Sequence, residues 1–332
     1  MNTFLGIDGG GSKTDFLLVD DTGRVLGEHR DGPAYHPETG LPQVQDLIAT
    51  GIHRTAEGSG IAPRDITYTF IGLPGYGEDS ALRGPLDTIA SPLLAQDRYR
   101  CDNDMVCGWA GALGCRDGIN VVSGTGSIAY GEFNGCRARV GGWGELFSDE
   151  GSAYWVAREG LALFARMSDE RAPRGPLYEH VRRHFKLESD LDLCAALYGS
   201  GAPLRSQIAG LATVIAEAAS QGDESARSIF TRAAEELVGL VEATRVRLRP
   251  PEGALLPVSY SGGMFRLRHL MLDGLEQGLA RAAHSFRLVP PRLPPNAGAA
   301  IYAAKTCGHP LSETALATLA AQLQDRRASM GP

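Results

Sequence analysis

The sequence predicts an α/β protein that consists of two related domains. An apolar run, a glycine-rich turn and a second apolar run occur twice, at residues 4–19 and at residues 121–130. Each of these hairpins begins a predicted three-stranded meander that is followed by helical and strand patterns, which is typical of α/β modules. The length of 332 residues suits two domains of ordinary size.

The first domain is expected to span residues 1–115. Its strands are predicted from runs that are apolar or alternate in polarity, and its first helix from the spacing of Val44, Leu47, Ile48 and Ile52. The predicted strands are residues 3–8, 14–20, 25–28, 66–73 and 99–101. The predicted helices are residues 44–56, 80–89 and 105–113.

The second domain is expected to span residues 116–305, after a hinge near residues 114–118. It repeats the meander and carries a helical insertion over about residues 153–250, where two prolines stop a long amphipathic helix. A C-terminal helix within residues 306–332 is expected to pack on the first domain. The predicted strands are residues 119–123, 128–133, 137–140, 255–260 and 286–289. The predicted helices are residues 153–167, 177–185, 191–198, 204–220, 224–248 and 269–282, one that begins at 296, and 312–326.

Composition excludes several classes of protein. The net charge of −7 argues against a surface for nucleic acid or for an anionic membrane. No apolar stretch reaches the roughly 18 residues that span a bilayer, and the N-terminus lacks the basic start of a signal peptide. The six cysteines show no zinc-site spacing, which favours reduced thiols in a cytoplasmic protein.

The two glycine turns are the first candidate binding sites. A strand–turn–strand of this kind leaves backbone N–H groups unpaired, and such groups bind anions, phosphate in particular. One turn covers Gly9–Thr14 (Gly9, Gly10, Gly11, Ser12, Lys13 and Thr14), and the other covers Gly124, Thr125, Gly126 and Ser127. The first is not a P-loop, because Ser12 separates the last glycine from Lys13 and a strand follows instead of a helix.

Two aspartates are candidates for chemistry. Asp8 ends a strand before three glycines, where a carboxylate can hold Mg²⁺ beside phosphates or can simply initiate the turn. Asp104 lies between a strand and a helix. Local sequence favours a helix N-cap for Asp104, and the alternative is a general base that accepts a proton from a hydroxyl.

Further candidates surround glycines. Gly142 and Gly144 flank Trp143, whose flat apolar face suits a sugar ring, and Asp149 is an acceptor for sugar hydroxyls. The alternative is a core tryptophan in a bend, with Asp149 capping the next helix. Gly262 and Gly263 after a buried strand, and Gly298–Ala300 at a helix start, suit either a purine-binding wall or tight packing.

These motifs, taken in order, resemble the BadF/BadG/BcrA/BcrD-type ATPase family, and most of all its N-acetylglucosamine kinase branch. That family belongs to the sugar kinase/heat-shock chaperone/actin superfamily. The resemblance covers nearly the whole chain. Its motifs are Gly6–Thr14, Asn103-Asp104, Ser123–Ser127, Gly141–Gly144, Asp149–Trp155, Ser261–Gly263 and Asn296–Ala300.

The resemblance implies two actin-like (ribonuclease H-like) domains with a hinge and an interdomain cleft for ATP and sugar. It implies an ATP-dependent kinase that phosphorylates the 6-hydroxyl of an amino sugar, with ATP, Mg²⁺ and the sugar as ligands, and it admits a homodimer. Asp8 and the Gly9–Thr14 turn would form one phosphate site with Mg²⁺, and Gly124–Ser127 the other. Asp104 would be the base. Thr125, Gly142, Trp143, Gly144 and Asp149 would bind the sugar, and Gly262 and Gly263 the adenosine.

One departure from the family pattern concerns the substrate. The loop after the first meander usually carries an Asn that contacts the amino sugar, whereas this chain has Tyr35 and His36 there. Glucosamine therefore stands beside N-acetylglucosamine as a candidate substrate. Two other functions remain: an ATPase that activates a partner redox enzyme, against which the scattered cysteines argue, and a noncatalytic ATP-binding regulator.

Overall fold

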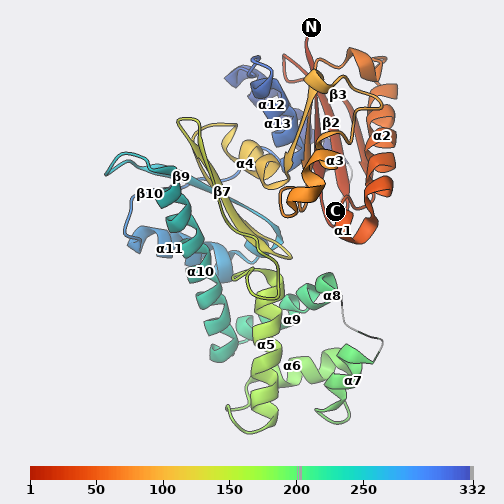
Figure 1. The fold of residues 1–332 in the computed structure, drawn as a ribbon. Helices are drawn as coiled ribbons and strands as arrows, with labels where there is room; N and C mark the ends of the chain where they lie inside the picture. Colours follow the sequence, from red (N-terminus) through yellow and green to blue (C-terminus); the bar gives the residue numbers. More distant parts are fainter. Residues whose placement is uncertain (200, 202–203, 330–332) are drawn as a thin grey trace. The chain divides into compact units, whose positions relative to one another are not determined.

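The computed structural model describes residues 1–199, 201 and 204–329, and the chain divides into two compact units. The first unit joins Met1–Asp117 with the chain from Pro290 onward, and the second is Gly118–Val289. Each unit contains one five-stranded sheet with helices on it (Figure 1). The predicted α/β class with two related domains is therefore confirmed.

The first sheet has the order β3-β2-β1-β4-β5. The first three strands form an antiparallel meander, and β4 and β5 then run parallel to β1. β1 is central and almost wholly buried, which accounts for its continuous apolar run. The strands are β1 (Thr3–Gly9), β2 (Thr14–Asp20), β3 (Val25–Asp31), β4 (Tyr68–Leu73) and β5 (Tyr99–Asn103).

Helices cover both faces of the first sheet (Figure 1). On one face, Gly51 of α2 lies against the ring of Phe16 in β2. On the other, a Cβ atom at Gly6 of β1 would lie 2.1 Å from the backbone nitrogen of Ala300, so α12 packs directly on the strand. The helices of this unit are α1 (His36–Thr39), α2 (Leu41–Glu57), α3 (Arg83–Asp87), α4 (Met105–Leu113), α12 (Pro295–Thr306) and α13 (Glu313–Ser329).

The second sheet repeats the topology of the first. Its order is β10-β9-β6-β7-β8, with an antiparallel meander of β6, β7 and β8 and with β9 and β10 parallel to β6. The β1–β2 and β6–β7 hairpins are thus equivalent elements of the two units. The strands are β6 (Gly118–Ser123), β7 (Ser127–Phe133), β8 (Cys136–Gly141), β9 (Leu256–Ser261) and β10 (Phe286–Leu288).

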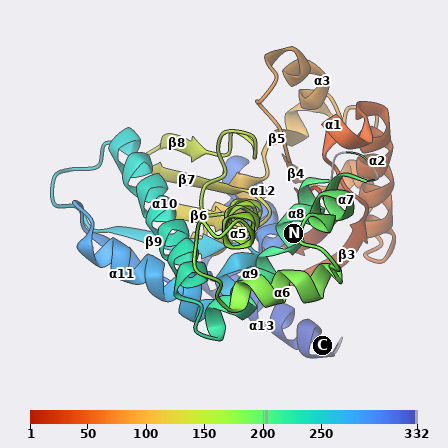
Figure 2. The same ribbon diagram turned by 90° about the horizontal axis from the view of Figure 1, so that it is seen from below.

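The predicted helical insertion lies between β8 and β9. Its first helix, α5, has α6, α8 and α9 packed around it (Figure 2). Its last helix, α10, packs on β7 and β8 through buried residues such as Leu237 and Val241. The helices of this unit are α5 (Ala153–Ser168), α6 (Pro176–Phe185), α7 (Asp192–Tyr198), α8 (Arg205–Gly210), α9 (Ala212–Ser220), α10 (Glu224–Leu248) and α11 (Asp273–Arg281).

Three segments differ from the sequence-based expectation. The helix expected at 80–89 is a short 3₁₀ turn followed by α3, since Gly84 and Pro85 both disfavour a long helix. The helix expected at 204–220 is divided into α8 and α9 at Leu211, directly after Gly210. Residues 290–305 group with the first unit, so the expected second domain of residues 116–305 is too long at its C-terminal end.

Close backbone contact explains why α12 belongs to the first unit. A Cβ atom at Gly298 would lie 2.0 Å from the carbonyl oxygen of Cys107 and 2.4 Å from the backbone nitrogen of Gly111, both in α4. Ala299 and Ala300 beside it are fully buried. Tight packing is thus the structural role of the Gly298–Ala300 stretch. In the described part of the chain, no helix has both the length and the apolar content needed to cross a membrane.

The α4–α12 contact gives a stability prediction. Gly298→Ala is expected to lower the free energy of unfolding by about 1–3 kcal/mol, because the added methyl group overlaps the backbone of α4. Gly239→Ala is the matched control, since position 239 is exposed in α10 and has no atom within 4 Å of the added Cβ. Urea unfolding should show slight stabilisation of the control. Equal stability of the two variants would contradict this packing argument.

Candidate functional site

The first glycine turn is the connection between β1 and β2, made by Gly10, Gly11, Ser12 and Lys13. The carbonyl oxygen of Gly10 accepts a hydrogen bond from the backbone nitrogen of Ala34 at 2.9 Å, which fixes one side of the turn. The N–H groups of Gly11, Ser12 and Lys13 donate no hydrogen bond to the described residues, and all three residues are exposed. The turn has the open amides that an anion site needs.

The two ends of the predicted phosphate stretch are buried. Gly9 ends β1 and Thr14 begins β2, where the two residues pair. The Thr14 hydroxyl donates to the carbonyl oxygen of Gly32 at 2.9 Å, and no part of Thr14 is exposed. The accessible part of the expected Gly9–Thr14 site is therefore its centre, residues 10–13.

Acidic side chains gather at the end of β1. Asp8 lies opposite Asp15 in the β1–β2 ladder, and Lys13 Nζ lies 2.6 Å from Asp15 Oδ2. The pKa of Asp8 is raised well above its ordinary value, first by burial and then by the charges of Asp104 and Asp15. The nearby Cys107 thiol opposes this rise in the pKa of Asp8, although its hydrogen bond goes to the carbonyl oxygen of Ile7 at 3.8 Å.

Asp104 lies between β5 and α4 at the N-cap position, but its side chain makes no capping hydrogen bond. The cap is provided by Asn103, whose Oδ1 accepts from the backbone nitrogen of Met105 at 3.1 Å. Asn103 Nδ2 also donates to the carbonyl oxygen of Tyr76 at 3.2 Å. The capping interpretation of the Asp104 side chain is therefore wrong, and the buried Asn103 fixes the backbone that carries Asp104.

Tyr35 and His36, at the start of α1, pack on the loop after β4. A Cβ atom at Gly75 would lie 3.1 Å from His36 Cε1 and 3.2 Å from Tyr35 Cε2. His36 is 7% exposed, and its Nδ1 has no hydrogen-bond partner among the described residues. The residues that replace the family Asn are thus packed partly inside the first unit.

The second glycine turn, Gly124–Gly126, connects β6 and β7. Its carbonyl groups are used inside the unit: Gly124 O accepts from Ala153 N at 2.9 Å, and Thr125 O accepts from Tyr154 N at 3.4 Å. The start of α5 therefore anchors this turn. The N–H groups of Thr125 and Gly126 donate no hydrogen bond within the described chain, and Thr125 is exposed.

Gly262, at the end of β9, lies directly against this turn. A Cβ atom there would lie 2.2 Å from the carbonyl oxygen of Ser123 and 2.9 Å from the backbone nitrogen of Gly124, and φ is +105°. Only glycine fits such a position without strain. Gly263 follows at the start of a short 3₁₀ helix, and a Cβ atom there would meet nothing within 4 Å.

The loop after β8 presents Trp143. Its side chain is 72% exposed, so the alternative of a core tryptophan is wrong. Gly142 and Gly144 on either side have φ values of +69° and +98°, which favour glycine. Leu146 and Phe147 of the same loop are also exposed.

Asp149, in contrast, is 2% exposed. Its Oδ1 accepts from the backbone nitrogen of Ser127 at 3.3 Å, so the carboxylate holds the end of the second turn. Burial raises the pKa of Asp149, while the charge of Arg205 lowers it. Asp149 does not cap α5, because the Ser152 hydroxyl accepts from Trp155 N at 3.2 Å and fills that role.

Sequence reasoning missed Arg205. This residue begins α8, and its Nη2 donates to Asp149 Oδ2. Its Nε lies 3.2 Å from Glu145 Oε2, without the geometry of a hydrogen bond. Arg205 is 56 positions from Asp149 in the chain, and no local motif marks it.

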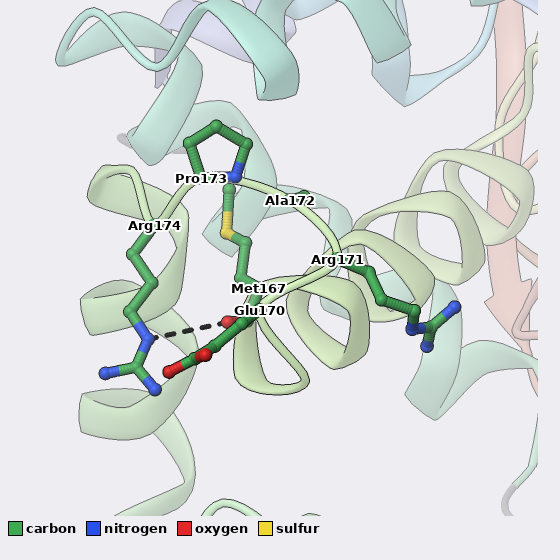
Figure 3. Close-up of a pocket in the computed structure, with 6 residues that line it drawn as sticks. All are labelled: Met167, Glu170, Arg171, Ala172, Pro173 and Arg174. Carbon is green, nitrogen blue, oxygen red and sulfur yellow. Dashed lines mark hydrogen bonds between the residues drawn. The ribbon is translucent and has the colours of Figure 1, made fainter.

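A surface pocket after α5 is lined by Met167, Glu170, Arg171, Ala172, Pro173 and Arg174, none of which belongs to a predicted site (Figure 3). In the described part of the chain, no group of three or more acidic, His or Cys side chains is arranged to hold a metal ion. A cation at Asp8 would therefore need water or phosphate oxygens as its other ligands.

Comparison with known families identifies the chain. The model of the BadF/BadG/BcrA/BcrD ATPase family matches residues 5–303. The chain belongs to this family. Two curated proteins resemble it along nearly the whole sequence, and the resemblance that the motifs indicated is confirmed.

The first of these BadF/BadG/BcrA/BcrD relatives is the N-acetylmuramic acid/N-acetylglucosamine kinase of Clostridium acetobutylicum. It is 29% identical over 92% of this chain and 100% of its own. The N-acetyl-D-glucosamine kinase of Dictyostelium discoideum is 26% identical over 90% of this chain and 97% of its own. The fold resembles the crystal structure of a candidate N-acetylglucosamine kinase from Chromobacterium violaceum, with a TM-score of 0.71, 24% identity and coverage of 90% of this chain and 98% of that one.

The predicted site residues of this BadF/BadG/BcrA/BcrD protein thus form two groups. The first unit brings together Asp8, Asp104 and the 10–13 turn through β1, β5 and α4. The second unit brings together the 124–127 turn, Asp149 and Gly262. Asn103 and Arg205 are additions that the structure makes to the two groups.

The acidic group in the first unit gives a second stability prediction. Asp8→Asn removes a carboxylate that is partly buried and faces other acidic groups, so it should raise the free energy of unfolding at pH 7 by up to about 1 kcal/mol. Because the folded-state pKa is raised, ionisation of Asp8 opposes folding. The gain should therefore shrink as the pH falls from the raised pKa toward the ordinary pKa of an aspartate, and it should be absent below the ordinary pKa.

The control is Asp46→Asn on the exposed side of α2, which should change stability little. Thermal unfolding of both variants at pH 7 and at pH 4 makes the comparison. A loss of stability in Asp8→Asn at pH 7 would contradict the electrostatic argument.

Proposed function

We propose that this protein is an ATP-dependent kinase that phosphorylates the 6-hydroxyl group of an amino sugar, with N-acetylglucosamine as the first candidate. The observation that carries the proposal is the pair of equivalent hairpin turns with unpaired amides, one in each unit. The family is one of ATPases, and both curated relatives described above are named as amino-sugar kinases.

The proposal assigns both turns to the phosphates of ATP. Residues 10–13 offer three unpaired N–H groups, and Thr125 and Gly126 offer two more. Backbone amides bind phosphate oxygens without adding a side chain that has to be ordered. Gly262, packed on the start of the second turn, and Gly263 beside it are assigned to the adenosine.

Asp104 is assigned as the general base. Its carboxylate is not used for capping, and Asn103 fixes the backbone around it. In the proposed step, Asp104 accepts the proton of the sugar hydroxyl as that oxygen bonds to the γ-phosphorus of ATP. The bond between the γ-phosphorus and the bridging oxygen breaks, and ADP leaves.

Asp8 is assigned to Mg²⁺. Carboxylate oxygen is the donor that Mg²⁺ prefers, and the acidic surroundings of Asp8 suit a divalent cation. A bound Mg²⁺ would neutralise charge on the phosphate oxygens. Lys13 lies beside Asp15 and adds a positive charge at the same end of the hairpin.

The sugar is assigned to the loop after β8 and to Thr125. Trp143 offers an exposed flat face to the sugar ring. Gly142 and Gly144 have positive φ values, a backbone conformation that residues with a side chain rarely adopt. Asp149 is buried and accepts from Ser127 N and Arg205, so a sugar hydroxyl would use its remaining lone pairs. Glucosamine is the second candidate substrate, because Tyr35 and His36 replace the family Asn.

The base assignment gives a kinetic prediction. Asp104→Asn should lower kcat by about 10²–10⁴-fold, since the amide cannot accept the hydroxyl proton, while nucleotide binding is retained. Asp102→Asn is the matched control, because Asp102 is a neighbouring carboxylate that pairs with Arg100. A coupled ADP-release assay and calorimetry with ADP measure the two quantities. Sugar phosphorylation by Asp104→Asn at the wild-type rate would refute the assignment.

The substrate is tested by a screen of ATP with glucosamine, N-acetylglucosamine, N-acetylmannosamine, N-acetylmuramic acid and glucose. We expect ADP release that depends on an amino sugar, with kcat/KM highest for N-acetylglucosamine. ADP release that is independent of any sugar would instead favour an ATPase or a regulator.

A further inference from the structure

The second turn has an electrostatic difficulty as a phosphate site, and the inference below rests on the proposed function of that turn. The Asp149 carboxylate lies directly against it: Oδ1 accepts from Ser127 N at 3.3 Å, and a Cβ atom at Gly126 would lie 2.8 Å from Oδ2. A buried negative charge at this distance repels a polyphosphate, and the repulsion is strong because burial reduces screening.

Arg205 lies at the same place. A Cβ atom at Gly126 would lie 2.2 Å from Arg205 Nη2, so the guanidinium group rests on the turn itself. Nη2 donates to Asp149 Oδ2, and the side chain of Arg205 is 31% exposed. The guanidinium group is thus close enough to offset the charge of Asp149 at the turn.

We propose that Arg205 is a positioning residue that cancels the charge of Asp149 beside the Gly124–Ser127 turn and thereby allows this turn to bind the phosphates of a nucleotide. The charged groups around Asp149 are Arg205, Glu145 and Glu150. Of these, Arg205 alone is positive. Without it, the Asp149 carboxylate beside the turn would have only negatively charged groups near it in this set.

The helical insertion holds Arg205 in place. Ile208 and Leu211, which follow Arg205 in the chain, are buried against Ala157 of α5. The start of α5 also anchors the second turn, since Ala153 N and Tyr154 N donate to the carbonyl oxygens of Gly124 and Thr125. The turn and its arginine are therefore both attached to α5, which gives the insertion a direct role in nucleotide binding.

Nucleotide binding in the absence of sugar tests the proposal by a double-mutant cycle. Calorimetry with ADP and Mg²⁺ is applied to Arg205→Gln, Arg205→Lys, Asp149→Asn and the Arg205→Gln/Asp149→Asn double variant of the full chain. Arg205→Gln is expected to raise the Kd for ADP about tenfold at low salt, with a smaller effect at high salt. Arg205→Lys keeps the positive charge and should raise the Kd less.

The double variant decides between charge cancellation and structural support. If Arg205 acts by cancelling the charge of Asp149, removal of both charges should return the Kd to within about twofold of the wild-type value. Asp149→Asn alone should bind ADP at least as tightly as the wild type, whatever its effect on sugar binding. A double variant that binds as weakly as Arg205→Gln would overturn the proposal.

The matched control is Arg171→Gln, which removes one positive charge from an exposed ion pair with Asp169 elsewhere in the same unit. Arg171 is labelled in Figure 3. Its Kd for ADP should equal that of the wild type, and an equal loss in the control would also overturn the proposal. A wild-type protein that binds no nucleotide would refute the proposed function together with this inference. A wild type that phosphorylates an amino sugar, with no recovery in the double variant, would refute this inference alone.

Discussion

A backbone turn can bind phosphate only if its N–H groups are left without protein partners, and both hairpins meet this condition in the same way. Each uses carbonyl groups for its anchorage: Gly10 O accepts from Ala34, and Gly124 O and Thr125 O accept from the start of α5. The amides between these anchors then remain unpaired within the described chain. The assignments of the three aspartates depend on these two fixed turns. Asp8 belongs to the strand before the first turn, and Asp104 is close enough to raise the pKa of Asp8. Asp149 accepts from Ser127 at the end of the second turn.

The two units balance buried negative charge differently. At the end of β1, Asp8 faces Asp104 and Asp15, and the Cys107 thiol lies nearby. At the start of β7, the carboxylate of Asp149 accepts a hydrogen bond from the guanidinium group of Arg205. Within the described chain the carboxylate of Asp8 forms no ion pair, whereas the carboxylate of Asp149 is paired with Arg205. This difference follows the proposed roles, in which only the first turn holds Mg²⁺.

The sequence predicts the parts of this structure that depend on local patterns. Apolar runs with glycine turns located both hairpins, and helical spacing located α2 and α10. Local patterns could not show that the chain from Pro290 onward belongs to the first unit. That grouping depends on contact between Gly298 and Gly111, which are far apart in the chain. Arg205 could not be found either, since nothing near it shows that its partner is Asp149. Local sequence also favoured Asp104 as the N-cap of α4. Only the hydrogen bond from Met105 N to Asn103 shows that the Asn103 side chain caps this helix instead.

The return of α12 to the first unit also affects how the protein is made. Gly6 of β1 is covered by Ala300, so one face of this strand is covered by a helix that is synthesised almost 300 residues later. The second unit, Gly118–Val289, is continuous in sequence and can complete its core earlier. The core of the first unit therefore cannot be complete until the second unit has been synthesised, and the face of β1 that α12 covers lacks this partner until then.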